Sequence, residues 1–303
     1  MSEPLSPAPT LSPWTRRLAW ANLVAQVGII VTGGAVRLTG SGLGCSTWPQ
    51  CEPGSFTPQF HEALTIHPYI EFGNRTLTGV LTVIALALAL LVRRETARPT
   101  WYRRLAWVPL AGVALQAVVG GITVLAKLHP AVVGVHMLVS LALVASSAVL
   151  VVRECATRPD AGVEDRWPAS ARTLGLGRLL AAVGAVLMVL GVVVTGAGPH
   201  GGDEEHAYRY AIDPVLAAKT HAGAVWIFVA VLAVLVVRLH RERAPRPTLR
   251  TWWVLVGVTL AQAAVGYVQY FTGLPEVVVG THLLGTGVLA ASLTWALAGL
   301  RRA

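Results

Sequence analysis

Long apolar runs alternate with short polar segments along almost the whole chain. Eight runs can be delimited, at roughly 18–36, 76–92, 106–126, 131–152, 179–197, 215–237, 252–271 and 277–300. Each is close to the ~20 residues that an α-helix needs to cross the hydrocarbon core of a bilayer. The pattern predicts an all-α membrane protein with eight transmembrane helices.

Composition supports this prediction and excludes a soluble globular protein. Apolar residues make up 54% of the 303 residues, charged residues only 13%, and the mean hydropathy is +0.60. Such values do not occur in ordinary soluble domains. Residues 1–17 have no basic segment followed by a short apolar core, so we expect no cleavable signal peptide there and a disordered cytoplasmic tail instead.

The formal net charge of +9 is explained by topology rather than by a nucleic-acid partner. Nineteen of the 24 Lys and Arg residues lie in the tail, in the loops after the second, fourth and sixth runs, and at the C-terminus. The remaining five are Arg37, Arg75, Lys127, Arg209 and Lys219. Because cytoplasmic loops carry the excess of Lys and Arg, we expect both termini to be cytoplasmic and membrane lipid, not nucleic acid, to surround the chain.

The sequence contains an internal repeat. A shift of 146 residues superposes Gln116 on Gln262, Gly120 on Gly266, Gly134 on Gly280 and His136 on His282. The segments IIVTGGA and VVVTGAG also match, at a shift of 163. We therefore predict two pseudo-symmetric four-helix bundles, 18–152 and 179–303, joined by a cytoplasmic linker at 153–178, with both halves inserted in the same direction. A bundle of this kind can hold a cofactor between facing helices.

Three histidines lie inside the predicted spans. His136, His221 and His282 each enter five or six residues from the outer boundary, which is roughly 8 Å at the helical rise. Imidazoles on alternate helices of the second half, His221 and His282, fit the two axial positions of a haem. The alternative is a packing role, with each ring bonded to a backbone carbonyl. Ionisable groups inside membrane helices are costly, and three at one depth favour ligands.

The first half carries a different polar set at the start of its second span, in HPYIEFGNRTLTG. Here His67, Glu71, Asn74 and Arg75 fall on one helix face, because they are three or four residues apart. One interpretation is a second site, in which this face lies opposite His136. The other is a surface Glu71–Arg75 pair that contributes a few tenths of a kcal/mol.

Two of the three cysteines, Cys45 and Cys51, lie in the long loop after the first run, on the predicted outer side. Thiols there can oxidise, so we expect a disulfide, with a redox-active pair or two free thiols as alternatives. The loop is rich in Gly and Pro and has no predicted helix or strand. We expect the bond to hold this flexible loop as a lid over the first-half site.

Taken together, the motifs RLTGSGLGCSTWPQC, IEFGNR, GVHMLVS, KTHAG and GTHLLGTG resemble those of haem A synthases, along essentially the whole chain. That family oxidises the C8 methyl of haem O to the formyl group of haem A for cytochrome oxidase. The resemblance implies a haem b cofactor ligated by His221 and His282, and a Cys45–Cys51 disulfide. It also implies a bacterial cell membrane location, with haem sites toward the extracytoplasmic side, and haem O synthase and a cytochrome oxidase subunit as candidate partners.

By the same resemblance the first half, with Glu71 and His136, receives haem O. The departure is Asn74, where the family pattern carries a histidine, and an amide is a poor axial ligand. We therefore expect His136 to be the main ligand of the substrate haem and Asn74 to bond to Glu71 or a water, with His67 as an alternative second ligand.

Two further roles concern charge at this site. Glu71 is the candidate catalytic group, stabilising charge at the reacting methyl carbon or accepting a proton. The outer cations Arg75 and Arg37 are candidates to contact the haem propionates. The competing functions are a dihaem electron-transfer cytochrome, which four histidines would favour, and a haem carrier or assembly factor without catalysis.

Overall fold

The computed structural model describes residues 12–59, 66–156, 169–203, 205 and 208–300. Within these ranges the helices are α1 (Pro13–Leu38), α2 (His67–Arg94), α3 (Thr100–Leu105), α4 (Val108–Leu125), α5 (Pro130–Ala156), α6 (Ala171–Ala197), α7 (Pro214–Arg241), α8 (Arg246–Phe271) and α9 (Glu276–Leu300). The short α3 and α4 together form one span. Eight described helical segments are long and apolar enough to cross a membrane, so the chain is a multi-pass membrane protein, as predicted.

Five spans begin five to nine residues before the apolar runs, at Pro13, His67, Thr100, Ala171 and Arg246, and two of these starts have a serine cap. Ser12 accepts a hydrogen bond from the Trp14 amide at the start of α1, and Ser170 accepts one from the Thr173 amide at the start of α6. A capped end tolerates polar residues in the first turn. Residues 13–17 of the expected tail and 171–178 of the expected linker are therefore helical. Residues 1–11 and 157–168 lie outside the described residues.

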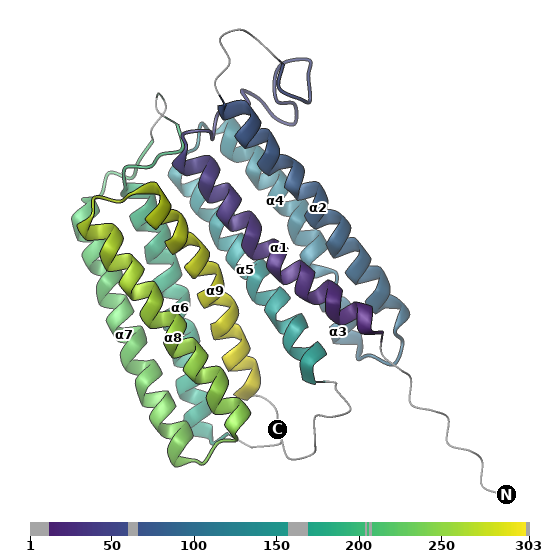
Figure 1. Cartoon of the computed structure of the whole chain (residues 1–303), viewed down its shortest axis with the longest axis vertical. Coiled ribbons are helices and arrows are strands. Elements are labelled where there is room, and N and C mark those ends of the chain that lie inside the picture. Colours follow the sequence, from purple (N-terminus) through teal and green to yellow (C-terminus); the bar gives the residue numbers. More distant parts are fainter. Residues whose placement is uncertain (1–11, 60–65, 157–168, 204, 206–207, 301–303) are drawn as a thin grey trace, which may run out of the picture.

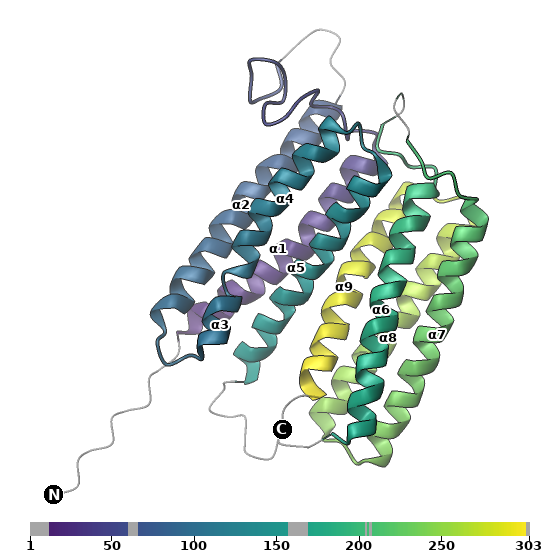
Figure 2. The ribbon, with the colours of Figure 1, turned by 180° about the vertical axis from the view of Figure 1, so that it is seen from behind.

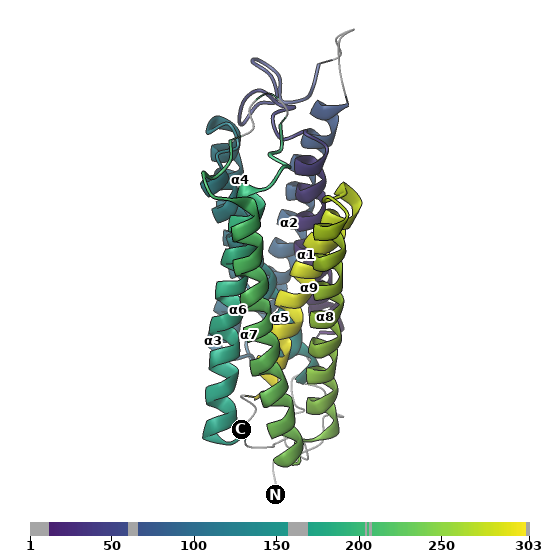
Figure 3. The same ribbon diagram turned by 90° about the vertical axis from the view of Figure 1, so that its left-hand side faces the viewer.

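The helices form two groups that lie side by side (Figures 1 and 2). In the first, neighbouring helices follow the cycle α1–α2–α4–α5, and in the second the cycle α6–α7–α8–α9, so α2 lies diagonal to α5 and α7 diagonal to α9. Helices α1 and α5 of the first group pack on α9 of the second. The long axes of both groups run in the same general direction (Figure 3).

The two ends of the molecule differ in chemistry. Helix α1 begins and α9 ends at the lower end of Figure 1, which we call the arginine-rich end. Helices α2, α5, α7 and α9 all begin at the opposite end, which we call the histidine end. That the arginine-rich end faces the cytoplasm stays a prediction from the distribution of Lys and Arg.

Matching carboxylate contacts at the arginine-rich end fix the register of the repeat. Glu95, which follows α2, accepts a 2.6 Å hydrogen bond from the Thr15 hydroxyl of α1. Glu242, which follows α7, accepts a 2.7 Å bond from the Thr173 hydroxyl of α6. Helix α6 thus corresponds to α1 at a shift of 158 residues. The shift of 163 taken from IIVTGGA and VVVTGAG does not hold at this end, because a match of three identical residues is easily displaced along a membrane helix.

Candidate functional site

The three histidines lie at nearly equal distances from the histidine end. His136 and His282 are six residues from the first residues of α5 and α9, and His221 is seven from that of α7. These separations correspond to about 9–11 Å along a helix. Since α7 is diagonal to α9, His221 and His282 lie on helices that face each other across the second group.

Each of these imidazoles packs against a glycine of the preceding helix. A Cβ atom built on the glycine would lie 3.2–3.4 Å from Cε1 of the ring in all three pairs, Gly120 with His136, Gly191 with His221 and Gly266 with His282. Ordinary carbon–carbon contacts begin near ~3.5 Å. The glycines therefore give the rings room between the helices. The repeat in the sequence aligned two of them, but nothing in it indicated that they face the histidines.

A glutamine on the same preceding helix fixes the backbone at two of the histidines. Gln116 Nε2 donates to the His136 carbonyl at 3.0 Å, and Gln262 Nε2 donates to the His282 carbonyl at 2.8 Å. A hydroxyl one turn further along, on Ser140 or Thr286, accepts from the same amide group. The repeated glutamines thus fix the helical turns that carry His136 and His282 in position relative to the preceding helix.

The imidazoles themselves have unused hydrogen-bonding capacity. Nδ1 of His136, His221 and His282 is buried with no hydrogen-bond partner, although the Leu187 carbonyl lies close to the His221 ring. A buried unsatisfied polar atom costs about 1–3 kcal/mol, so three at one depth require an explanation. The packing alternative would have each ring bond a backbone carbonyl, and Nδ1 of His136 and of His282 has no such partner.

This donor set fits a haem. Among the described residues no group of three or more His, Cys, Asp or Glu side chains could hold a metal ion. A haem iron needs only one or two protein ligands, and imidazole nitrogens are common among them. His221 and His282 are the residues that would hold it between α7 and α9.

In the first group, Glu71 lies one turn from Asn74, toward the histidine end, and both of its carboxylate oxygens are engaged. Oε2 accepts a 2.7 Å bond from the Cys45 amide, and Oε1 accepts bonds from Arg75 at 2.5 and 3.1 Å. Arg75 also donates to the carbonyls of Thr47 and Gln50. The pair predicted from sequence is therefore buried and ties the outer loop to α2, so it is not a simple surface pair.

The outer loop is closed by the predicted disulfide. Cys45 and Cys51 are bonded at an S–S distance of 2.08 Å, and both are fully buried. The Trp48 indole lies directly against Gly121 of α4, next to the glycine that faces His136. The loop lies at the histidine end above α2 and α4 (Figure 1). It is held more firmly than its Gly and Pro content indicated, because buried charged groups bond its backbone.

Two candidate ligand residues have protein partners instead. Asn74 Oδ1 accepts a 2.8 Å bond from the Thr32 hydroxyl of α1, a contact that the sequence analysis, which proposed Glu71 or water, did not foresee. His67 Nδ1 is 2.8 Å from the Ser41 hydroxyl in the outer loop. Among the described histidines of this half, His136 is therefore the one whose buried Nδ1 has no partner.

Arg37 joins the two halves. Its Nε donates to the His200 carbonyl at 2.7 Å and its Nη2 donates to the Thr195 carbonyl at 2.8 Å, both beyond the interface between the groups. The Gly42 amide adds a 2.8 Å bond to the Gly202 carbonyl. The sequence placed Arg37 near a haem and gave no sign of this connecting role.

Fold and site together define a class, the multi-pass α-helical membrane proteins in which two similar four-helix groups carry half-buried histidines near one end of the helices. A family model described as "Cytochrome oxidase assembly protein", COX15-CtaA, matches residues 16–211. This is more than half of the chain, and the chain therefore belongs to that family.

Several curated relatives are called "Heme A synthase". The chain is 31% identical over 128 residues to the protein of Bacillus licheniformis (42% of this chain, 41% of the relative) and 36% identical over 127 residues to that of Bacillus pumilus (40% and 39%). It is 33% identical over 130 residues to that of Lysinibacillus sphaericus (42% and 41%). The matches span about two fifths of the length of these relatives.

Proposed function

We propose that this chain is a haem A synthase, which oxidises the C8 methyl of haem O to the formyl group of haem A. The observation that carries the proposal is the asymmetry between the halves. Among the described residues, half-buried imidazoles whose Nδ1 is buried without a partner occur on both diagonal helices of the second group, but on only one of the first, where Asn74 accepts a bond from Thr32. The names of the relatives support the same activity.

In this proposal the second group, 179–303, holds haem b between His221 and His282. The bound haem supplies the redox chemistry that no side chain provides. Gly191 and Gly266, opposite the rings, leave room for the imidazoles between the helices. Gln262 fixes the position of the His282 backbone through its bond to the carbonyl. These contacts orient the ligand nitrogens before the macrocycle binds, which limits the entropy lost on binding.

The first group, 18–152, receives haem O with His136 as its main axial ligand. A site that binds, converts and releases a haem benefits from weak ligation, because a product with two strong ligands would leave slowly. The Asn74 amide meets that need. Arg37 engages only its Nε and Nη2 groups in the bonds described above, so it has N–H groups left for a propionate. Arg75 already makes five hydrogen bonds, to Glu71 and to the carbonyls of Thr47 and Gln50, and would bind a propionate by exchanging some of them.

Glu71 is the proposed catalytic residue. Arg75 and the Cys45 amide hold its carboxylate in one orientation at the histidine end of α2. From there it stabilises positive charge that develops at the methyl carbon, or accepts a proton from the oxygen being added. The Cys45–Cys51 loop excludes water above it. In the cell, the proposal places the chain in a bacterial cell membrane with this site on the extracytoplasmic side, where haem O synthase would deliver substrate and a cytochrome oxidase subunit would receive product.

The test is co-expression with a source of haem O, followed by pigment extraction and by spectroscopy of the purified protein. Wild-type protein should yield haem A and a low-spin b-type spectrum. His221→Ala or His282→Ala should abolish or strongly change that spectrum, whereas His240→Ala, at the other end of α7, should not. Glu71→Gln and His136→Ala should keep the b-type haem and lose haem A.

The outcomes separate the competing functions. Two bound haems without haem A would indicate an electron-transfer cytochrome, and released haem O without conversion would indicate a carrier. Wild-type spectra in both second-half variants would refute the ligand assignment.

A further inference from the structure

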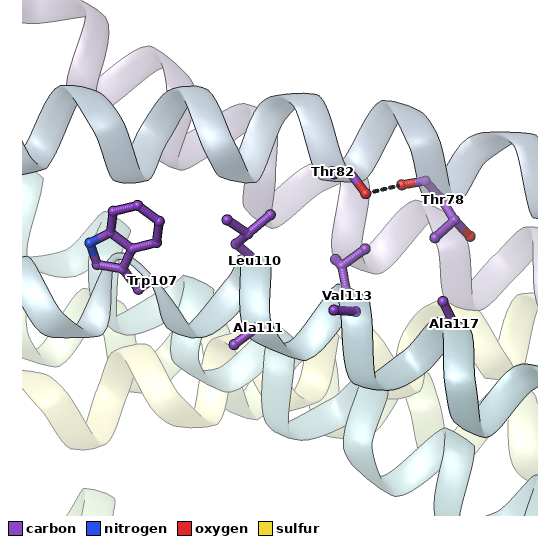
Figure 4. A pocket seen from close by; sticks show the side chains of 8 residues that line it. Thr78, Thr82, Trp107, Leu110, Ala111, Val113 and Ala117 are labelled. Carbon is purple, nitrogen blue, oxygen red and sulfur yellow. Dashed lines mark hydrogen bonds between the residues drawn. The ribbon is translucent and has the colours of Figure 1, made fainter.

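A cavity of about 290 Å³ opens between α2 and α4, on the side of the arginine-rich end. Its α4 wall runs from Trp107 through Leu110 and Ala114 to Ala117, and its α2 wall is formed by Thr78 and Thr82. Figure 4 shows Leu110 and Val113 of α4 on one side of the space and Thr82 and Thr78 of α2 on the other. The Thr82 hydroxyl donates to the Thr78 carbonyl at 2.8 Å, so it is not available to a ligand. The lining is apolar and suits a hydrocarbon chain.

A second cavity, of about 330 Å³, adjoins the first at the arginine-rich end. It is lined by Arg93, Arg103, Arg104 and Thr100, and shares Trp107 with the apolar cavity. Nε of Arg103 is buried and has no hydrogen-bond partner. Arg93 and Arg104 are exposed and Arg103 is half-buried, so three guanidinium groups border one cavity and one of them has a buried donor without an acceptor, an arrangement that favours an anion.

We propose that the two cavities together bind one anionic phospholipid, with its phosphate against the three arginines and one acyl chain between α2 and α4. The dimensions agree with this occupant. From Trp107 to Ala117 the α4 wall spans ten residues, or about 15 Å, which is half of the ~30 Å hydrocarbon core and hence one leaflet. Trp107 lies where the two cavities meet, and Trp is enriched at that level of a bilayer.

Charge selects the headgroup. The lining of the polar cavity carries three positive charges and no acidic residue. Basic pockets beside membrane helices bind anionic headgroups, whereas a zwitterionic lipid gains little from three cations. The prenyl-type tail of a hydrophobic substrate could enter the apolar cavity, but it would leave the arginines without a partner. The proposal does not depend on haem chemistry.

The experiment is native mass spectrometry of full-length protein, delipidated in detergent and then titrated with phosphatidylglycerol or with phosphatidylcholine of the same acyl chains. The wild type should retain one phosphatidylglycerol in preference to phosphatidylcholine. The double variant Arg103→Gln/Arg104→Gln should weaken retention about thirtyfold. The control Arg246→Gln/Arg250→Gln removes the same charge at the start of α8, at the same end, and should leave retention unchanged.

A second pair of variants tests the apolar part without altering charge. Ala114→Trp fills the groove and should lower retention, whereas Leu115→Trp, at a neighbouring exposed position outside the groove, should not. Equal retention of both lipids, binding of inorganic phosphate alone with equal strength, or an unaffected Ala114→Trp would overturn the proposal. Displacement of the lipid by the tail of a haem substrate would also overturn the proposal. A loss of haem A synthesis with normal lipid retention would bear on the proposed function only.

Discussion

The buried Glu71–Arg75 pair allows a quantitative prediction. Glu71 is 5% exposed, and replacing it with Gln keeps an acceptor for the Cys45 amide but removes the charge that faces Arg75. Arg75 would then keep its bonds to the carbonyls of Thr47 and Gln50. The substitution therefore isolates the carboxylate–guanidinium interaction and leaves the other anchors of the loop in place.

The expected magnitude follows from burial. Breaking a fully buried ion pair costs about 3–5 kcal/mol, and a hydrogen bond to a charged group contributes about 1.5–3 kcal/mol. The Arg75 side chain is 21% exposed, so water screens the pair in part. We expect a coupling free energy of about 2 kcal/mol between the two side chains.

A double-mutant cycle measures this coupling. Thermal or denaturant unfolding would be followed in detergent for wild type, Glu71→Gln, Arg75→Gln and the double variant. The matched control is Arg238 with Glu242, another pair four residues apart, whose side chains are 30% and 20% exposed. A coupling between Glu71 and Arg75 no larger than that of the control pair would refute the view that this pair anchors the outer loop.

Three further predictions test other parts of the structure. The double variant Cys45→Ser/Cys51→Ser should lose haem A yield more than thermal stability, because the disulfide holds the loop over the site. Mass spectrometry of non-reduced peptides should show the Cys45–Cys51 link. Free thiols in protein isolated from membranes would contradict this prediction. Gly266→Ala should change the haem spectrum, because the new Cβ would lie 3.3 Å from the facing imidazole of His282. Gly257→Ala should leave the spectrum unchanged, because a Cβ there would meet nothing within 4 Å. Equal spectra in the two variants would rule out the view that the glycine makes room for the imidazole. Partial burial alone would raise the pKa of Glu242, but hydrogen bonds from Ser170, Thr173 and Arg238 outweigh burial and lower that pKa to about 2. The ionised Glu242 carboxylate therefore stabilises the fold at pH values above its ordinary pKa of 4.5, and this stabilisation is lost as the pH falls toward 2. Melting temperatures should therefore fall more steeply over that range in wild type than in Glu242→Gln, and parallel curves would argue against the prediction.

The spans and the disulfide could be predicted because each depends on a strong local signal. A run of ~20 apolar residues has few alternatives to a membrane helix. Two cysteines in one outer loop have a natural partner in each other. Helix starts were less well predicted, since Ser12 and Ser170 act through single hydrogen bonds that precede the apolar residues.

Contacts between helices could not be predicted from one sequence. The glycines opposite the histidines, the Thr32–Asn74 bond and the role of Arg37 depend on which helix faces lie together, and apolar periodicity in a membrane helix carries little of that information. The histidines were found because ionisable residues are rare in these spans. Their neighbours are ordinary residues and carried no comparable signal.

The contact made by Asn74 has an evolutionary consequence. Its Oδ1 accepts one hydrogen bond, from the Thr32 hydroxyl of α1. A neutral imidazole also carries a nitrogen that can accept such a bond, so a histidine at this position could keep the same partner. A lineage could exchange asparagine and histidine at position 74 in either direction without rebuilding the helices, so ligand strength in the first half can change while the fold stays the same.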